Sequence, residues 1–175
     1  MTVAAGVRAS ILVFVVALLQ AGVVSSTFVF GGAPDLLLVV VVALGLLRGS
    51  IPGAVFGFAG GLVVDLVTLD TLGVTSLVLT LAGFWAGRYG ETTGRGRQLA
   101  PALAVGVITV LAAIFGLVLH YMLGDAVVAH QALVTTLIPE LLLNLLLAYP
   151  VFWLVRKVVG ERFVAKPAAE VELVV

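Results

Sequence analysis

Residues 34–65 read PDLLLVVVVALGLLRGSIPGAVFGFAGGLVVD. Two apolar segments, 36–47 and 52–68, flank a short turn that carries Arg48. Long apolar runs are typical of membrane helices, and the basic residues of membrane proteins stay on the cytoplasmic side. The stretch therefore predicts two membrane helices joined by a turn at the cytoplasmic surface.

The remaining basic residues extend this pattern to the whole chain. All nine Lys and Arg fall into clusters, and enough apolar sequence for two crossings separates each cluster from the next. Asp35, Asp70 and Asp125 lie between the clusters, at the outer ends of the predicted crossings. The alternation predicts six crossings with both termini in the cytoplasm. The clusters are Arg8; Arg48; Arg88, Arg95 and Arg97; and Arg156, Lys157, Arg162 and Lys166.

Composition supports an integral membrane protein. Of the 175 residues, 62% are hydrophobic and 10% are charged, whereas about a quarter of the residues of a soluble domain are charged. We therefore predict an all-α bundle of six transmembrane helices in one domain, residues 1–166, and a disordered cytoplasmic tail, residues 167–175. The net charge is zero and cysteine is absent, so we expect neither nucleic-acid binding nor disulfide or thiolate chemistry.

Two of the predicted crossings leave alternatives open. The first resembles a secretory signal peptide, but its removal would break the alternation of charge, so we favour an uncleaved anchor. The second is short for a crossing, which a tilted neighbour, a locally thinned bilayer or a re-entrant hairpin with the third would explain. The crossings are expected at about 7–27, 36–47, 52–68, 72–87, 99–122 and 133–155.

The third crossing carries a stripe of small residues. Gly53, Gly57 and Gly61 recur every four residues and share a helical face, with Gly60 beside them. Such a stripe lets another helix approach closely. It predicts either tight packing within the bundle or a docking groove for a partner's transmembrane helix. Asp65 lies near the same stripe, where an ionisable side chain should face protein or water, so we include it in the predicted docking set.

Polar residues also occur in the sixth crossing. Glu140 and Asn144 are four residues apart and so share one face of a helix. Counted along their helices, Asp65 and Glu140 both fall in the outer half of the membrane, and His120 lies at a similar level. A structural role, partner recognition and transport all remain open for these intramembrane groups. Convergence of Asp65 and Glu140 on a water-filled cavity would favour transport or ligand binding.

The sequence shows no catalytic motif. HExxH is absent, and Asp65 and Asp70 lie too close in sequence for a convincing aspartyl dyad. We expect residues 88–98 to form a flexible glycine-rich inner loop. We expect no nucleotide site there, because no Gly-Lys-Ser/Thr follows its glycines and no strand precedes them. The expected sites therefore include no catalytic residue, metal or cofactor.

The block from residue 34 to 87 carries a set of short motifs and single residues. These are Pro34-Asp35-Leu36, Leu47-Arg48-Gly49, Gly53, Gly57, Phe58, Gly60, Gly61, Leu62, Asp65 and Leu72-Gly73. In these residues the block resembles the rod-shape-determining protein MreD family. The resemblance implies a component of the bacterial inner membrane without catalytic residues. It also implies partners, namely the bitopic protein MreC, a SEDS glycosyltransferase and a class B penicillin-binding protein, with which the family directs lateral peptidoglycan synthesis.

A second function class is compatible with the same hydropathy. Substrate-capture subunits of vitamin importers are also six-helix membrane proteins of this size. Such a subunit needs a ligand pocket that opens outward, and the predicted positions of Asp65, Glu140 and His120 allow one. Bound vitamin in the purified protein would distinguish this alternative from a scaffold.

Overall fold

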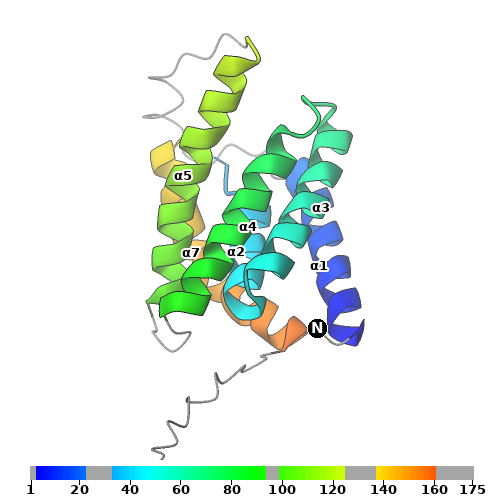
Figure 1. Ribbon diagram of the computed structural model, residues 1–175, viewed down its shortest axis with the longest axis vertical. Coiled ribbons are helices and arrows are strands. Elements are labelled where there is room, and N and C mark those ends of the chain that lie inside the picture. Colours follow the sequence, from blue (N-terminus) through cyan, green and yellow to red (C-terminus); the bar gives the residue numbers. More distant parts are fainter. Residues whose placement is uncertain (1–2, 23–32, 94–98, 125–136, 161–175) are drawn as a thin grey trace, which may run out of the picture.

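The computed structural model describes residues 3–22, 33–93, 99–124 and 137–160, which form a bundle of helices (Figure 1). The predicted tail 167–175 and the predicted loop positions Arg95, Arg97 and Asp125 lie outside the described residues. The helices are α1 (Val3–Gly22), α2 (Leu36–Arg48), α3 (Ser50–Thr68), α4 (Val74–Thr93), α5 (Ala100–Met122) and α7 (Leu137–Val159).

The helices confirm the predicted all-α membrane bundle. Four of them, α1, α3, α5 and α7, are long and apolar enough to cross a membrane. The helix α2 is shorter, with 13 residues, and α4 carries Arg88 and Glu91 near its end. Helix α4 also corrects one prediction, because it continues through Thr93 where we expected a loop from residue 88. The Arg88–Glu91 ion pair, three residues apart, supports this added turn.

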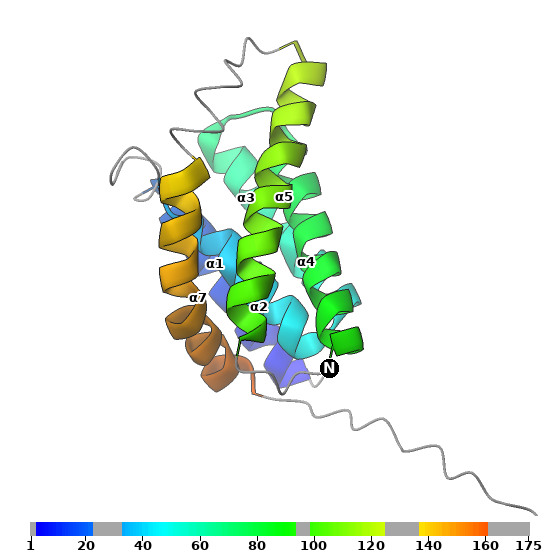
Figure 2. The same ribbon diagram turned by 90° about the vertical axis from the view of Figure 1, so that its left-hand side faces the viewer.

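The short helix α2 forms the centre of the bundle. It packs against all five other described helices, and residues 37–47 are all buried. Figure 2 shows the same central position from a second side. Thirteen residues rise about 20 Å, less than the roughly 30 Å of a hydrocarbon core. A helix that protein surrounds has no lipid-facing surface, so its length need not match the bilayer when its polar ends find protein partners.

Charge separates the two ends of the bundle. The chain enters α1 and leaves α2, α4 and α7 at one end, which we call the basic end (Figure 1). The opposite, acidic end contains the starts of α2 and α7 and the connection between α3 and α4. This sorting agrees with the alternation in the sequence, and the positive-inside rule predicts that the basic end faces the cytoplasm. The described cations of the basic end are Arg8, Arg48, Arg88, Arg156 and Lys157.

Candidate functional site

The glycine stripe of α3 packs against the backbone of α4. A Cβ atom built on Gly53 would meet the carbonyl oxygen of Gly83, and one built on Gly57 would meet that of Leu79. At Gly61 the obstacle is the backbone nitrogen of Ser76, at 2.6 Å. Real Cβ contacts essentially never fall below 3.0 Å. Any side chain at these three positions would therefore push the two helices apart.

Helix α4 contributes glycines of its own to this contact. A Cβ on Gly83 would meet the carbonyl oxygen of Gly53, and one on Gly87 would meet the backbone of Ser50. Neither glycine belongs to the set predicted from the sequence. Their spacing of four is the same signal that identified the stripe in α3, so a search for paired stripes would have found them.

Gly60 serves a different contact. A Cβ there would lie 2.8 Å from Cγ1 of Val13 on α1 and 3.1 Å from Cδ1 of Leu37 on α2. The predicted set therefore divides between two faces of α3. Tight packing within the bundle is confirmed for the three glycines that α4 covers, and a partner helix would reach them only by displacing α4. Gly60 is the member of the set that lies beside an open groove, described below.

Asp65 caps the neighbouring helix α4. Its side chain is buried, with 1% exposure, and its oxygens accept hydrogen bonds from the backbone N–H groups of Gly73 (2.9 Å), Thr75 (3.3 Å) and Ser76 (3.3 Å). The Ser76 hydroxyl donates a further bond at 3.2 Å. The first N–H groups of a helix have no partner within that helix. A carboxylate at this position also interacts favourably with the positive end of the helix dipole. Asp65 thus performs the role of an N-cap from another helix.

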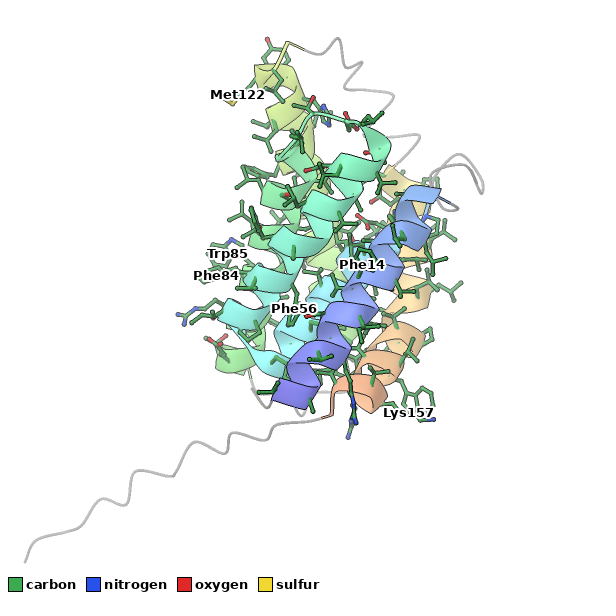
Figure 3. The ribbon with its side chains drawn as sticks, turned by 90° about the vertical axis from the view of Figure 1, so that its right-hand side faces the viewer. Phe14, Phe56, Phe84, Trp85, Met122 and Lys157 are labelled. Carbon is green, nitrogen blue, oxygen red and sulfur yellow. The ribbon has the colours of Figure 1, made fainter. Side chains whose placement is uncertain are left out.

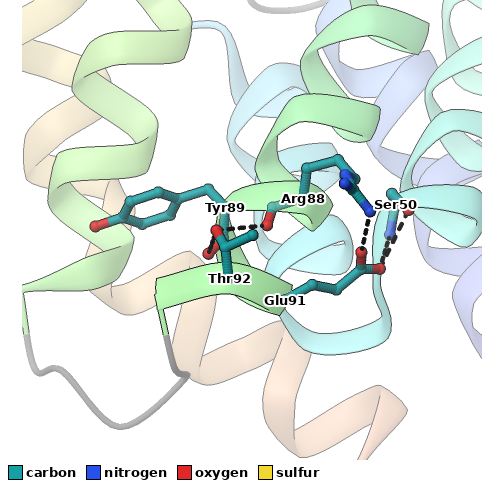
Figure 4. A network of polar contacts seen from close by, with 5 residues as sticks. All are labelled: Ser50, Arg88, Tyr89, Glu91 and Thr92. Carbon is teal, nitrogen blue, oxygen red and sulfur yellow. Dashed lines mark hydrogen bonds and ion pairs between the residues drawn. The ribbon is translucent and has the colours of Figure 1, made fainter.

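A second carboxylate caps α3 at the basic end. Helix α3 starts after Gly49, which has no side chain to cap it. Oε1 of Glu91, on α4, accepts hydrogen bonds from the backbone N–H of Ser50 (2.9 Å) and from its hydroxyl (3.1 Å), as Figure 4 shows. The Ser50 N–H is the main reason why the pKa of Glu91 lies below its usual value of 4.5, and Arg88 adds to the effect. Each helix of the α3–α4 pair therefore supplies the carboxylate that caps the other.

Polar side chains from three helices surround the start of α2. Oδ1 of Asn144, on α7, accepts a hydrogen bond from the Asp35 N–H (2.8 Å), and its Nδ2 donates to Oγ1 of Thr109 on α5 (3.3 Å). On α1, Oε1 of Gln20 accepts from the Leu36 N–H at 3.0 Å. Asn144 and Thr109 are fully buried. Asn144 was predicted as an intramembrane polar residue. Gln20 and Thr109 were not predicted, although Gln20 interrupts an apolar run.

The two intramembrane acids belong to different clusters. Asp65 binds the start of α4, whereas Glu140 interacts electrostatically with Asp35 at the start of α2. Helix α3 packs chiefly on α4, and α7 packs on α2 and α5. The structure therefore does not bring Asp65 and Glu140 together. Within the described ranges, no group of three or more His, Cys, Asp or Glu side chains is arranged to hold a metal ion.

The described residues form an apolar groove between α1 and α3 and another between α4 and α5, both on the outside of the bundle. The larger, of about 490 Å³, lies between α1 and α3 and is bordered by Phe14 and Phe56 (Figure 3). Its lining includes the small residues Ser10, Ala59 and Gly60. The smaller groove, of about 190 Å³, lies between α4 and α5 and has a bulkier lining. That lining consists of Val78, Leu81, Ala82, Trp85, Ile108, Leu111, Ala112 and Phe115.

Comparison with known proteins identifies the family. No curated protein and no solved structure matches the chain significantly. The family described as rod shape-determining protein MreD matches residues 4–159, which include all the described helices except the first residue of α1. The match extends the resemblance of residues 34–87 to both halves of the chain. This multi-pass membrane protein therefore belongs to the MreD family of rod shape-determining proteins.

Proposed function

We propose that this protein is a non-catalytic scaffold of the bacterial inner membrane that binds the single transmembrane helix of an MreC-like partner in the α1–α3 groove. Family membership provides the role in rod shape determination. In this proposal the scaffold also positions a SEDS glycosyltransferase and a class B penicillin-binding protein beside the MreC-like partner. The importer alternative depended on hydropathy, on helix number and on the predicted positions of Asp65, Glu140 and His120. The family match gives it no support.

The lining of the α1–α3 groove is the observation that supports this docking position. Helices associate in membranes chiefly through close packing, which small residues at the contact permit. Ser10 and Ala59 are both exposed in the groove, and Gly60 forms part of its floor. Phe14 and Phe56 at its borders provide the area for contact with an inserted helix. The docking hypothesis thus retains Gly60 from the predicted set and adds residues of α1.

The proposed contact leaves the α3–α4 pair intact. Gly53, Gly57, Gly61 and Asp65 then act indirectly, because they hold α3 in the position from which Ala59 and Gly60 line the groove. A rigid helical surface of this kind positions a partner more accurately than a loop would. In this proposal the partner therefore binds an assembled bundle and does not replace one of its helices.

The test is co-purification of the MreC-like protein with variants that fill one groove or the other. Ala59→Leu adds bulk to the α1–α3 groove at an exposed position, and Ala112→Leu adds the same bulk to the α4–α5 groove. We expect Ala59→Leu to lower recovery of the partner about tenfold, which corresponds to about 1.4 kcal/mol. Ala112→Leu should leave recovery unchanged. Equal recovery with both variants would refute this docking position, and loss with Ala112→Leu alone would move it to the other groove.

A further inference from the structure

We propose that the bundle carries a binding site for an anionic phospholipid at its basic end, where α1 begins and α7 ends. Arg8 and Lys157 provide its cationic contacts, and Trp153 provides a ring at the level of the headgroup. We call these three residues the α1–α7 edge. The proposal concerns lipid recognition and does not depend on the docking position of a protein partner.

The exposed face of α7 leads directly to this edge. Leu142, Leu146 and Trp153 are 63%, 74% and 62% exposed, and their spacing of four and seven residues places them on one side of the helix. Large apolar side chains exposed in this way on a membrane-spanning helix face acyl chains. Trp153 then lies near the end of the apolar stripe, where the amphipathic indole ring prefers the membrane–water boundary.

A cation lies over that indole ring. Nζ of Lys157 is 5.1 Å from the centroid of the Trp153 ring, a distance at which the ammonium group and the ring attract each other. This contact holds the charge beside the apolar stripe. Figure 3 shows Lys157 at the end of α7, and the last turns of α7 lie beside the first turns of α1. Arg8 is an exposed residue of those turns.

Among the described residues, no carboxylate balances the charge of the edge. Within the parts of the chain that the structure describes, neither Arg8 nor Lys157 forms an ion pair with a carboxylate. Arg88, at the end of α4, differs because Glu91 lies 3.4 Å away. Cations near an anionic bilayer surface each contribute about 1 kcal/mol to its attraction. Arg8 and Lys157 therefore favour a negatively charged occupant.

The apolar stripe decides which kind of anionic occupant fits. A phospholipid combines a charged headgroup with acyl chains directly beneath it, and the edge presents the complementary order: Arg8 and Lys157 at the boundary, then Trp153, then Leu146. An acidic segment of a soluble protein would match the cations only. The combination of charge and adjacent apolar surface therefore assigns the site to a membrane lipid.

The two tryptophans of the chain make this proposal testable, because each reports on one side of the bundle. Trp85 lies on α4, near the Arg88–Glu91 pair, and is 59% exposed. The Trp85→Phe protein keeps Trp153 as its only tryptophan, and the Trp153→Phe protein keeps Trp85. Each is reconstituted into phosphatidylcholine vesicles that contain either brominated phosphatidylglycerol or brominated phosphatidylcholine. Bromine quenches tryptophan fluorescence on contact, so the ratio of the two quenching curves gives the preference for the anionic lipid.

We expect Trp153 to be quenched preferentially by the anionic lipid, with a preference of about fivefold for each participating cation. Trp85 should be quenched almost equally by both lipids. Arg8→Gln in the Trp85→Phe background should lower the preference of Trp153 quenching for the anionic lipid. This substitution leaves the Lys157–Trp153 contact in place. Adding Lys157→Gln should lower this preference for the anionic lipid further. Lys157→Arg, which keeps the positive charge, should restore the preference that Lys157→Gln removes. Arg88→Gln should leave the preference unchanged.

Three results would overturn the proposal. Equal quenching of Trp153 by both lipids would show that the edge does not select an anionic headgroup. The same preference at Trp85 as at Trp153 would assign selectivity to the overall charge of the basic end, not to a site on α1 and α7. A preference that survives in the combined Arg8→Gln and Lys157→Gln variant would likewise exclude these two side chains as its source.

Discussion

Gly53 and Gly83 face each other so closely that a Cβ atom built on either residue would strike the carbonyl oxygen of the other. The contact joins α3 to α4 backbone to backbone, at a point where neither helix can relieve the clash by moving a side chain. Tightly packed contacts of this kind tolerate little added volume. The α3–α4 pair is therefore the part of the fold most sensitive to a single added methyl group.

Gly83→Ala should destabilise the folded protein by about 1–3 kcal/mol, the usual effect of overpacking. Gly116→Ala is the matched control, because it makes the same change within α5 at a site where a Cβ meets nothing within 4 Å. Alanine is the better helix former by about 1 kcal/mol, so the control should be neutral or stabilising. Unfolding in detergent, followed by circular dichroism, measures both. Equal stability of the two variants would contradict the close approach of α3 and α4.

Asp65→Ala should destabilise the protein by about 1–3 kcal/mol, because it leaves several buried hydrogen-bond donors at the start of α4 without their acceptor. Asp70→Ala provides the comparison at the same end of the bundle, where the exposed carboxylate accepts a bond from the adjacent Thr71 N–H and from no other described residue. The same unfolding measurement should show a much smaller loss of stability for the Asp70→Ala variant. A larger loss from the Asp70 variant would refute the capping role of Asp65.

The lowered pKa of Glu91 predicts a dependence of stability on pH. A carboxyl group whose pKa is lower in the folded than in the unfolded state stabilises the fold above its unfolded value, here about 4.5. That contribution is lost as the pH falls below 4.5 and through the folded pKa. Between about pH 5 and about pH 3, the Glu91→Gln variant should therefore lose less stability than the parent protein. Parallel curves for the two proteins would exclude Glu91 as a source of this dependence.

Asn144 and Thr109 should be energetically coupled. Asn144→Ala removes the acceptor of the partly buried Asp35 N–H and the donor to the buried Thr109, so we expect a loss of about 1–3 kcal/mol. A double-mutant cycle with Thr109→Val isolates the bond between the two side chains, and such bonds in membrane proteins are worth about 0.6 kcal/mol on average. Leu146→Ala, at a residue that is 74% exposed on the same helix, should change stability little. Strictly additive effects would show that the side-chain bond contributes nothing.

The predicted orientation can be tested by cysteine labelling, since the natural chain contains no cysteine. Thr92→Cys is placed at an exposed position of the basic end, and Met122→Cys at the opposite end, where Met122 is 76% exposed. In intact cells a membrane-impermeant thiol reagent should label only the variant at Met122. Labelling at Thr92 without permeabilisation would reverse the topology and place the α1–α7 edge on the outer surface.

The helices themselves were largely predictable from local sequence. The run 36–47 contains no charged residue, and Arg48 follows it directly. The structure places α2 at Leu36–Arg48. Helix α5 likewise agrees with the prediction within one residue at its start. Both succeed because hydropathy and helix-ending residues act over a few turns of one segment. The predicted end of α4 was wrong because its last turn depends on a contact between distant segments. Glu91 accepts a hydrogen bond from the backbone N–H of Ser50 on α3.

The sequence by itself determined that this chain is a helical membrane protein and that its charges divide between two ends, because burial in lipid restricts composition residue by residue. Only the tertiary structure decided what the polar and small residues do. It directs Gly53, Gly57 and Gly61 to α4, and it makes Asp65 the cap of α4. Helix periodicity shows which residues share a face. Which neighbour covers that face depends on packing between segments distant in the chain, and a single sequence carries no direct signal of it.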